Sequence, residues 1–188
     1  MVSQFLTSLK RTVLIAGVFA LPNGLQAGTP LVYTDGNTPL FQVEVPDFWS
    51  VRTGGIRDLT APDAEDVRDV SRIFGMTPES HDGIWVGFVS PHGVATLEGA
   101  RNYLTEIGQF LVKDAVVAKT KTRRIAGLPA QTFSGTGSRD GKSLEFTAIT
   151  IDLPNDRVAV SVVVFEAGSD ADIINDINDM MASVKAIR

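Results

Sequence analysis

Two histidines, His81 and His92, and no cysteine are available for chemistry that needs an imidazole or a thiol. Ser90 lies two residues before His92, so one hypothesis is a hydrolase in which His92 serves as the base for a serine nucleophile. The Gly-x-Ser-x-Gly turn that presents such a serine is missing, and side chains this close on a loop point in different directions. We therefore interpret residues 90–93 as a turn after a strand, and no catalytic residue is predicted.

Neither a metal site nor a cofactor site is predicted. A zinc site takes three or four nitrogen or sulfur ligands, and the two histidines with Asp82 barely reach that number. The acidic stretch 63–69 lacks the loop spacing of a calcium site and is typical of a solvated helix face. Gly135 and Gly137 lie inside a predicted hairpin without a third glycine, so they are interpreted as strand glycines that allow twist or close packing.

The basic run at 119–124 stands out in an acidic chain and has two interpretations. The favoured one is an edge strand whose charges prevent pairing with other sheets. The other is a surface that holds an anion or an acidic partner. Trp49 follows a turn near the sheet end, although core packing is the favoured role of its ring. The candidate binding surface comprises Trp49, His92, Lys119, Lys121, Arg123 and Arg124.

Hydrophobic periodicity predicts the elements that position these residues. Helices are expected over 62–74, over 97–112 after a Thr96 cap, and from Ser169 onward. Segments 84–89 and 157–166 are apolar in both alternating sets, which is typical of strands covered on both faces. The strand 143–153 changes its apolar phase, so it contains a bulge or has two covered faces.

Short connections between the strands, including the turn at Asp140 and Gly141, favour an antiparallel sheet. With three helices available as cover, we expect one α+β domain over residues 28–188. Its fold class is a single antiparallel β-sheet flanked by α-helices on both faces, an α/β/α sandwich.

Residues 1–27 are typical of a signal peptide. Lys10 and Arg11 precede the apolar run 12–21, and cleavage is expected near Ala27, which places the mature chain in the periplasm. Removing two of the 17 basic residues leaves 15 against 22 acidic ones, a net charge of −7. This charge disfavours nucleic acid, and no second apolar run predicts membrane insertion after cleavage. Without cysteine, an N-terminal lipid anchor is excluded.

Three motifs, in this order, resemble the Mog1/PsbP-like fold group, and more narrowly its small exported bacterial members of unknown function. The motifs are FQVEVPDFW at 41–49, GLPA at 127–130 leading to SGTG at 134–137, and SVK at 183–185. The resemblance implies a sheet flanked by helices and an accessory role, in which members dock onto other proteins and are generally not enzymes.

The expected function is therefore that of a non-catalytic periplasmic accessory or binding protein. It would act by protein–protein or small-ligand binding, with an envelope protein as the expected kind of partner. The alternative is a periplasmic hydrolase that uses Ser90 and His92. The ligand, the partner and the oligomeric state are left open.

Overall fold

The computed structural model describes residues 28–54, 57–60, 67–70 and 73–188. The strands are Thr29–Asp35 (β1), Thr38–Val45 (β2), Trp49–Thr53 (β3), Arg57–Thr60 (β4), Val67–Val70 (β5), Phe74–Pro78 (β6), Trp85–Val89 (β7), Lys113–Ile125 (β8), Leu128–Arg139 (β9), Lys142–Leu153 (β10), Arg157–Glu166 (β11) and Lys185–Ala186 (β12). The helices are Leu97–Leu111 (α1) and Ala171–Ala182 (α2). Neither of these two helices combines the length and the apolar character that crossing a membrane requires.

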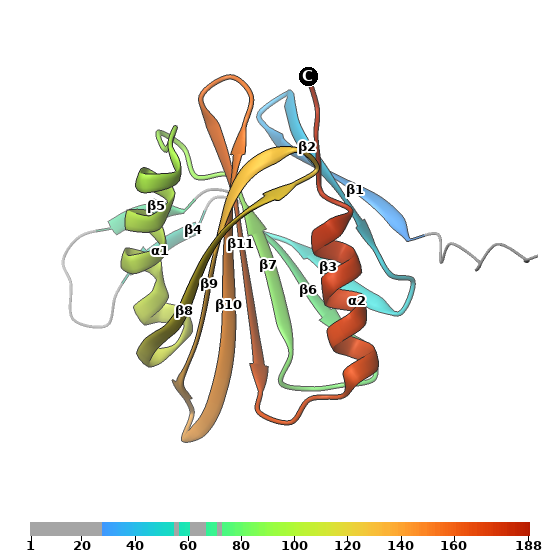
Figure 1. Cartoon of the computed structure of the whole chain (residues 1–188), viewed down its shortest axis with the longest axis vertical. Coiled ribbons are helices and arrows are strands. Elements are labelled where there is room, and N and C mark those ends of the chain that lie inside the picture. Colours follow the sequence, from blue (N-terminus) through green and yellow to red (C-terminus); the bar gives the residue numbers. More distant parts are fainter. Residues whose placement is uncertain (1–27, 55–56, 61–66, 71–72) are drawn as a thin grey trace, which may run out of the picture.

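The strands form three antiparallel sheets. The large sheet has seven strands in the order β3-β6-β7-β11-β10-β9-β8. A second sheet has three strands, β1-β2-β12, and β4 pairs with β5 in a separate hairpin. Figure 1 shows α1 and α2 on opposite sides of the large sheet.

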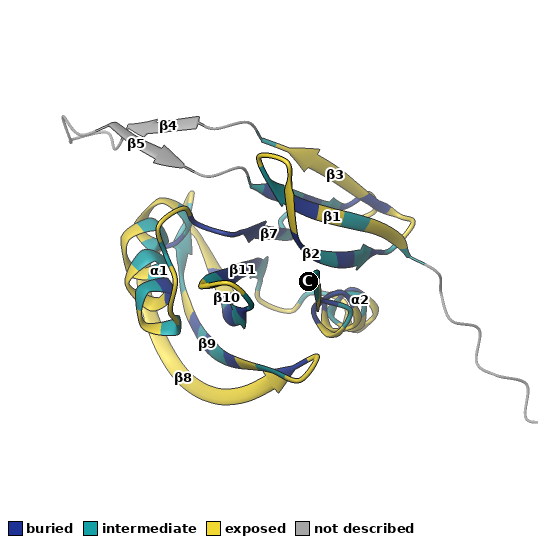
Figure 2. Ribbon diagram, turned by 90° about the horizontal axis from the view of Figure 1, so that it is seen from above, coloured by how far each residue is buried: buried dark blue, intermediate teal, exposed yellow. Residues whose placement is uncertain are grey.

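Two hydrophobic clusters cover the two faces of the large sheet. On one face, Phe146, Val160 and Val162 pack with the α1 residues Ala100 and Leu104. On the other face, a second cluster joins the sheet to α2 and to the three-stranded sheet. In Figure 2 the buried residues line the space between these layers, while β8 runs exposed along the outside.

The predicted single sheet flanked by helices on both faces is wrong, because a second sheet completes the cover on the α2 side. Phe41 and Val43 of β2 are fully buried there, and the ring of Tyr33 stacks on that of Phe41 at a centroid distance of 4.9 Å. The Tyr33 ring also lies 5.0 Å from that of Phe74 on the large sheet. The β1–β2 hairpin thus packs aromatic rings against the large sheet and provides the cover that a further helix was expected to provide.

The predicted helix over 62–74 is also wrong. Val67–Val70 forms β5, which pairs with β4, and Phe74 begins β6; residues 61–66 and 71–72 lie outside the described residues. Valine is β-branched and favours an extended backbone. Pairing with β4 therefore outweighs the acidic helix-start pattern that predicted a helix.

The other two predicted helices are confirmed, with one correction at a cap. Thr96 caps α1 and accepts a hydrogen bond from the Gly99 amide at 3.0 Å. The cap of α2 is Asp170, which accepts from the Asp172 amide at 3.0 Å. Ser169, the predicted cap, instead donates its hydroxyl to the Glu166 carbonyl at 2.8 Å.

The change of apolar phase along β10 arises from two covered faces and not from a bulge. The pairings of β10 with β9 and β11 run without a register shift. Phe146 and Ala148 belong to the cluster under α1, whereas Ile149 and Ile151 belong to the cluster under α2. The strand therefore presents apolar side chains to the α1 layer in its first half and to the α2 layer in its second half.

The pairing of β8 with β9 is irregular, and glycines on β9 make it possible. The register shifts between Lys113 and Val116 and again between Val117 and Lys119. A Cβ added at Gly135 would overlap the backbone carbonyl of Val116. Close packing is therefore the role of Gly135, because the main chain of β8 lies too near β9 at this point to leave room for a side chain.

Gly135→Ala should destabilise the fold by about 2 kcal/mol, because β8 must move away from its main-chain contact on β9. The free energy of unfolding from urea titration measures the loss. Gly108→Ala is the matched control, since no described atom outside its own helix backbone lies within 4 Å of an added Cβ there. Equal stability of the Gly135→Ala variant and the wild type would contradict this account.

Candidate functional site

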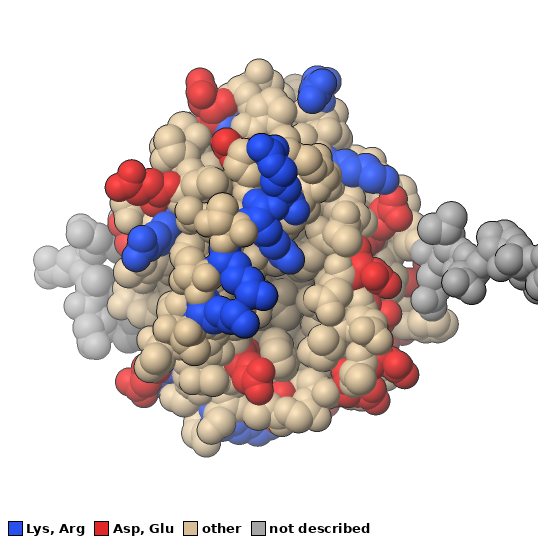
Figure 3. All heavy atoms as spheres, viewed as in Figure 1, with Lys and Arg blue, Asp and Glu red and all other residues tan. Residues whose placement is uncertain are grey.

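Strand β8 forms one edge of the large sheet and is the most basic surface of the described chain. Its residues from Lys113 to Arg124 are all exposed, and it carries five of the 17 lysines and arginines. Lys119, Lys121 and Arg123 pair with every second residue of β9, namely Ser134, Thr132 and Ala130. Their side chains therefore share one face of the sheet. Figure 3 shows basic side chains in a stripe across this side of the molecule.

Most of the basic side chains of the run at 119–124 form no ion pair within the described part of the chain. Lys119, Lys121 and Arg123 make no ion pair with a described residue. Arg124 donates from Nη1 to the Gly127 carbonyl at 2.6 Å, which holds it at the β8–β9 turn. An exposed edge position fits both interpretations of the run, protection of the edge and a binding surface.

A large pocket lies between α1 and the curled end of the sheet, and we call it the α1 pocket. Its volume is about 640 Å³. Apolar side chains from both layers line it, chiefly Leu104, Leu111, Val117, Phe133 and Phe146. Polar groups gather along its length and include Arg101, Thr105, Gln109, Lys113, Asp114 and Thr120.

Gly108 helps to open the α1 pocket. It lines the pocket from α1, and an added Cβ there would point into open space. Sequence reasoning missed this pocket, although a glycine in the middle of an amphipathic helix is the one local signal of it.

A second hollow lies on the opposite face of the sheet, between α2 and strands β8 to β11, and we call it the α2 groove. Its volume is about 510 Å³. Arg123 and Arg124 line it from β8, whereas Lys119 and Lys121 do not. The structure therefore separates the basic run into two residues at a groove and two on the open strand.

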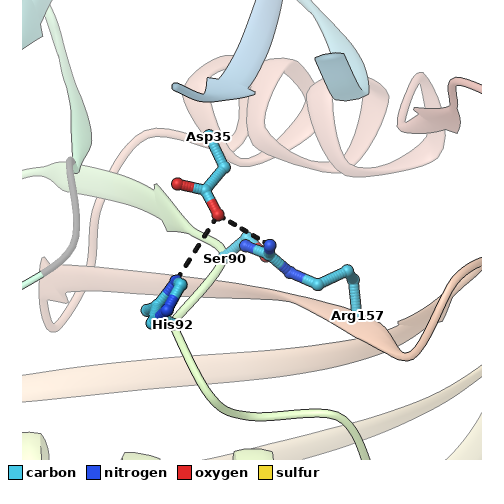
Figure 4. Close-up of polar contacts among 4 residues, drawn as sticks. All are labelled: Asp35, Ser90, His92 and Arg157. Atoms are coloured by element: carbon cyan, nitrogen blue, oxygen red, sulfur yellow. Dashed lines mark hydrogen bonds and ion pairs between the residues drawn. The ribbon is translucent and has the colours of Figure 1, made fainter. Parts of the chain in front are cut away.

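His92 and Ser90 lie close to a carboxylate, that of Asp35 at the end of β1. Asp35 Oδ2 lies 2.6 Å from Arg157 Nη1 and 3.6 Å from His92 Nδ1. Arg157 Nη2 donates to Ser90 Oγ at 3.2 Å. As Figure 4 shows, Asp35 stands between His92 and Arg157, with Ser90 against the guanidinium.

This arrangement does not fit a serine nucleophile. Ser90 is 2% exposed, so its hydroxyl is closed to a substrate. Its oxygen accepts from the Arg157 guanidinium, whereas an activated serine donates its proton to a base. The Asp35–Arg157 pair instead joins β1 of the small sheet to β11 of the large one, which is a structural role.

Trp49 lies in the core and away from β8. It is 6% exposed, and its Nε1 donates to Asp176 Oδ2 at 3.2 Å, which links β3 to α2. Of the six candidate surface residues, the structure thus brings four together on β8. It places His92 beside Asp35 and buries Trp49.

Within the described ranges, no three His, Asp or Glu side chains gather closely enough to hold a metal ion. His81 is exposed and its Nδ1 lies 2.8 Å from Ser80 Oγ. His92 Nδ1 lies 3.6 Å from the carboxylate of Asp35.

No family model matches the sequence, and no curated protein sequence is similar to it. Solved structures with a similar fold include LpqN of Mycobacterium tuberculosis, described as involved in cell envelope biogenesis. It is 14% identical with a TM-score of 0.52, over 85% of this chain and 90% of LpqN. A protein of Bacteroides thetaiotaomicron is 10% identical with a TM-score of 0.51, over 86% of this chain and 49% of its own.

The matches also include CyanoP, the PsbP protein of Synechocystis sp. PCC 6803. It is 14% identical with a TM-score of 0.47, over 91% of this chain and 100% of CyanoP. The predicted resemblance to a PsbP-like fold group is thus found again among solved structures. At these identities the likeness concerns the fold alone.

Asp35→Asn should lower the free energy of unfolding at pH 7 by about 1 kcal/mol at most, because the carboxylate is 39% exposed and water screens the pair. The hydrogen bond and charge of Arg157 hold the pKa of Asp35 below its ordinary value of 3.8, and His92 adds to this effect against the opposing effect of burial. The stabilisation is therefore complete above pH 3.8 and disappears as pH falls through the lower folded pKa.

Urea titrations of both proteins between pH 7 and pH 2.5 measure this difference. The gap between the two curves of stability against pH should narrow as pH falls below 3.8, because Asp35 of the wild type then begins to take up a proton. A gap that stays constant down to the lowest pH would show that the ion pair is not its cause.

Proposed function

We propose that residues 28–188 act as a single-domain, non-catalytic accessory protein of the periplasm that binds a small apolar molecule in the α1 pocket. The observation that carries this proposal is the pocket itself. Its volume of about 640 Å³ falls within the range of small-molecule sites, roughly 300–1,000 Å³. Its lining combines apolar side chains with a smaller number of polar ones, which matches the usual composition of such sites.

The position of the pocket supports a ligand rather than imperfect packing. Phe133 and Phe146 belong to the cluster that α1 covers, and both also line the pocket. The pocket is open to solvent, so its apolar lining is left in contact with water. A molecule with an apolar body would displace that water and cover the lining, which is favourable.

The lining offers positioning groups without a catalytic set. Among the described residues it contains no histidine and no cysteine, and one acidic residue, Asp114. Arg101 and Lys113 supply positive charge and hydrogen-bond donors for the polar end of a ligand. These groups support binding and orientation, which is what an accessory protein requires.

Gly108→Leu should close the α1 pocket without harming the fold, because the added side chain enters open space and leucine favours helix more than glycine does. The test is a titration with 1-N-phenylnaphthylamine, a neutral probe that fluoresces in apolar surroundings. We expect saturable binding to the wild type and an affinity lowered about tenfold, or 1.4 kcal/mol, in the variant.

Gly108→Ala is the control. It should keep the affinity of the wild type within about twofold and raise stability by about 1 kcal/mol. The proposal is overturned if the wild type gives no saturable signal, or if Gly108→Leu binds the probe as tightly as the wild type does.

Export is tested by fractionating cells that produce the full chain and sequencing the N-terminus of the purified protein. The expected result is a periplasmic protein that begins at Gly28, because cleavage favours the small residue at Ala27. A chain found in the cytoplasm with residues 1–27 intact would refute this part of the proposal.

A further inference from the structure

The α2 groove combines side-chain hydroxyls, two arginines and an apolar wall. One wall is the sheet, which contributes the hydroxyls of Thr132, Ser134 and Thr147. The other wall is α2, which contributes Ile174, Ile177, Asn178 and Met181. Arg123 and Arg124 close the end at the β8–β9 turn, so a polar, basic end meets an apolar wall.

The charge of the groove is of one sign. The lining contains two arginines and no aspartate or glutamate, although α2 carries several aspartates. One of them, Asp176, accepts the Trp49 hydrogen bond instead. Arg123 has no ion-pair partner among the described residues, so its guanidinium is available to a ligand anion.

The hydroxyls in the groove have hydrogen-bonding capacity to spare. Thr132 Oγ1 is buried and has no hydrogen-bond partner among the described residues. Ser134 Oγ and Thr147 Oγ1 lie 3.2 Å apart, and a bond between them uses one of their two protons. Buried polar atoms are nearly always paired, so an orphan in the wall of a groove indicates a missing partner.

We infer that the α2 groove binds a small organic carboxylate, that is, a carboxylate carried on an apolar body. The carboxylate would accept from Arg123 and from the free hydroxyl protons, which are charge-assisted bonds of the stronger kind. The apolar body would lie against Ile174 and Met181 on α2. This site is separate from the α1 pocket, so either can fail without the other.

Titration of the ¹⁵N-labelled mature protein with octanoate, followed by amide chemical shifts, tests the inference. Saturable shifts are expected at Thr132, Ser134 and Asn178. Arg123→Gln should weaken octanoate binding at these amides about tenfold, because a hydrogen bond to a charged group is lost. Lys119→Gln removes the same charge from the same strand outside the groove and should change the affinity less than twofold.

Octanol and inorganic phosphate test the apolar body and the anionic group of the ligand separately. Neither should shift these amides at concentrations at which octanoate saturates them. Octanol binding as well as octanoate would overturn the role of the carboxylate, and phosphate binding as well would overturn that of the apolar body. Equal losses in the two variants would assign the effect to diffuse charge, and shifts confined to Leu104 and Gly108 would assign octanoate to the α1 pocket.

Discussion

Both faces of the seven-stranded sheet are apolar at its central strands, and neither can be left in water there. The cover available is short: α1 has 15 residues and α2 has 12, whereas β8 and β9 have 13 and 12. At 1.5 Å per helical residue and 3.3 Å per strand residue, the helices span about 20 Å and the strands about 40 Å. The small sheet covers part of the remainder, and at the β8 end the α1 pocket and the α2 groove remain open.

Charge is distributed according to the same geometry. The chain is acidic overall, yet five of its 17 basic residues lie on β8, one of the two edge strands of the large sheet. A charged edge discourages pairing with another sheet, and the same side chains give the α2 groove its positive end. The two interpretations of the basic run are therefore compatible, because Lys119 and Lys121 lie on the open strand while Arg123 and Arg124 reach the groove.

Local pattern predicted much of the fold, and long-range packing accounts for what it missed. The doubly apolar strands β7 and β11 implied cover on both faces, and helical spacing located α1 and α2. Nothing local shows that the β1–β2 hairpin folds over the large sheet, since that depends on Tyr33 meeting Phe74 some forty residues away. The basic run was visible in the sequence because its residues lie close together along the chain. The α1 pocket was not, because it depends on where α1 stops covering the sheet.

The α1 pocket and the α2 groove share strand β9, and the alternation of side chains along this strand decides which of the two a residue lines. Phe133 lies in the α1 pocket, while its neighbours Thr132 and Ser134 lie in the α2 groove. Because successive side chains of a strand point to opposite faces, hydroxyls and aromatic rings can alternate here without conflict. A polar residue at 133 would enter an apolar floor, and an apolar residue at 132 would remove an unpaired hydroxyl. The alternation therefore separates the apolar lining of the α1 pocket from the polar lining of the α2 groove.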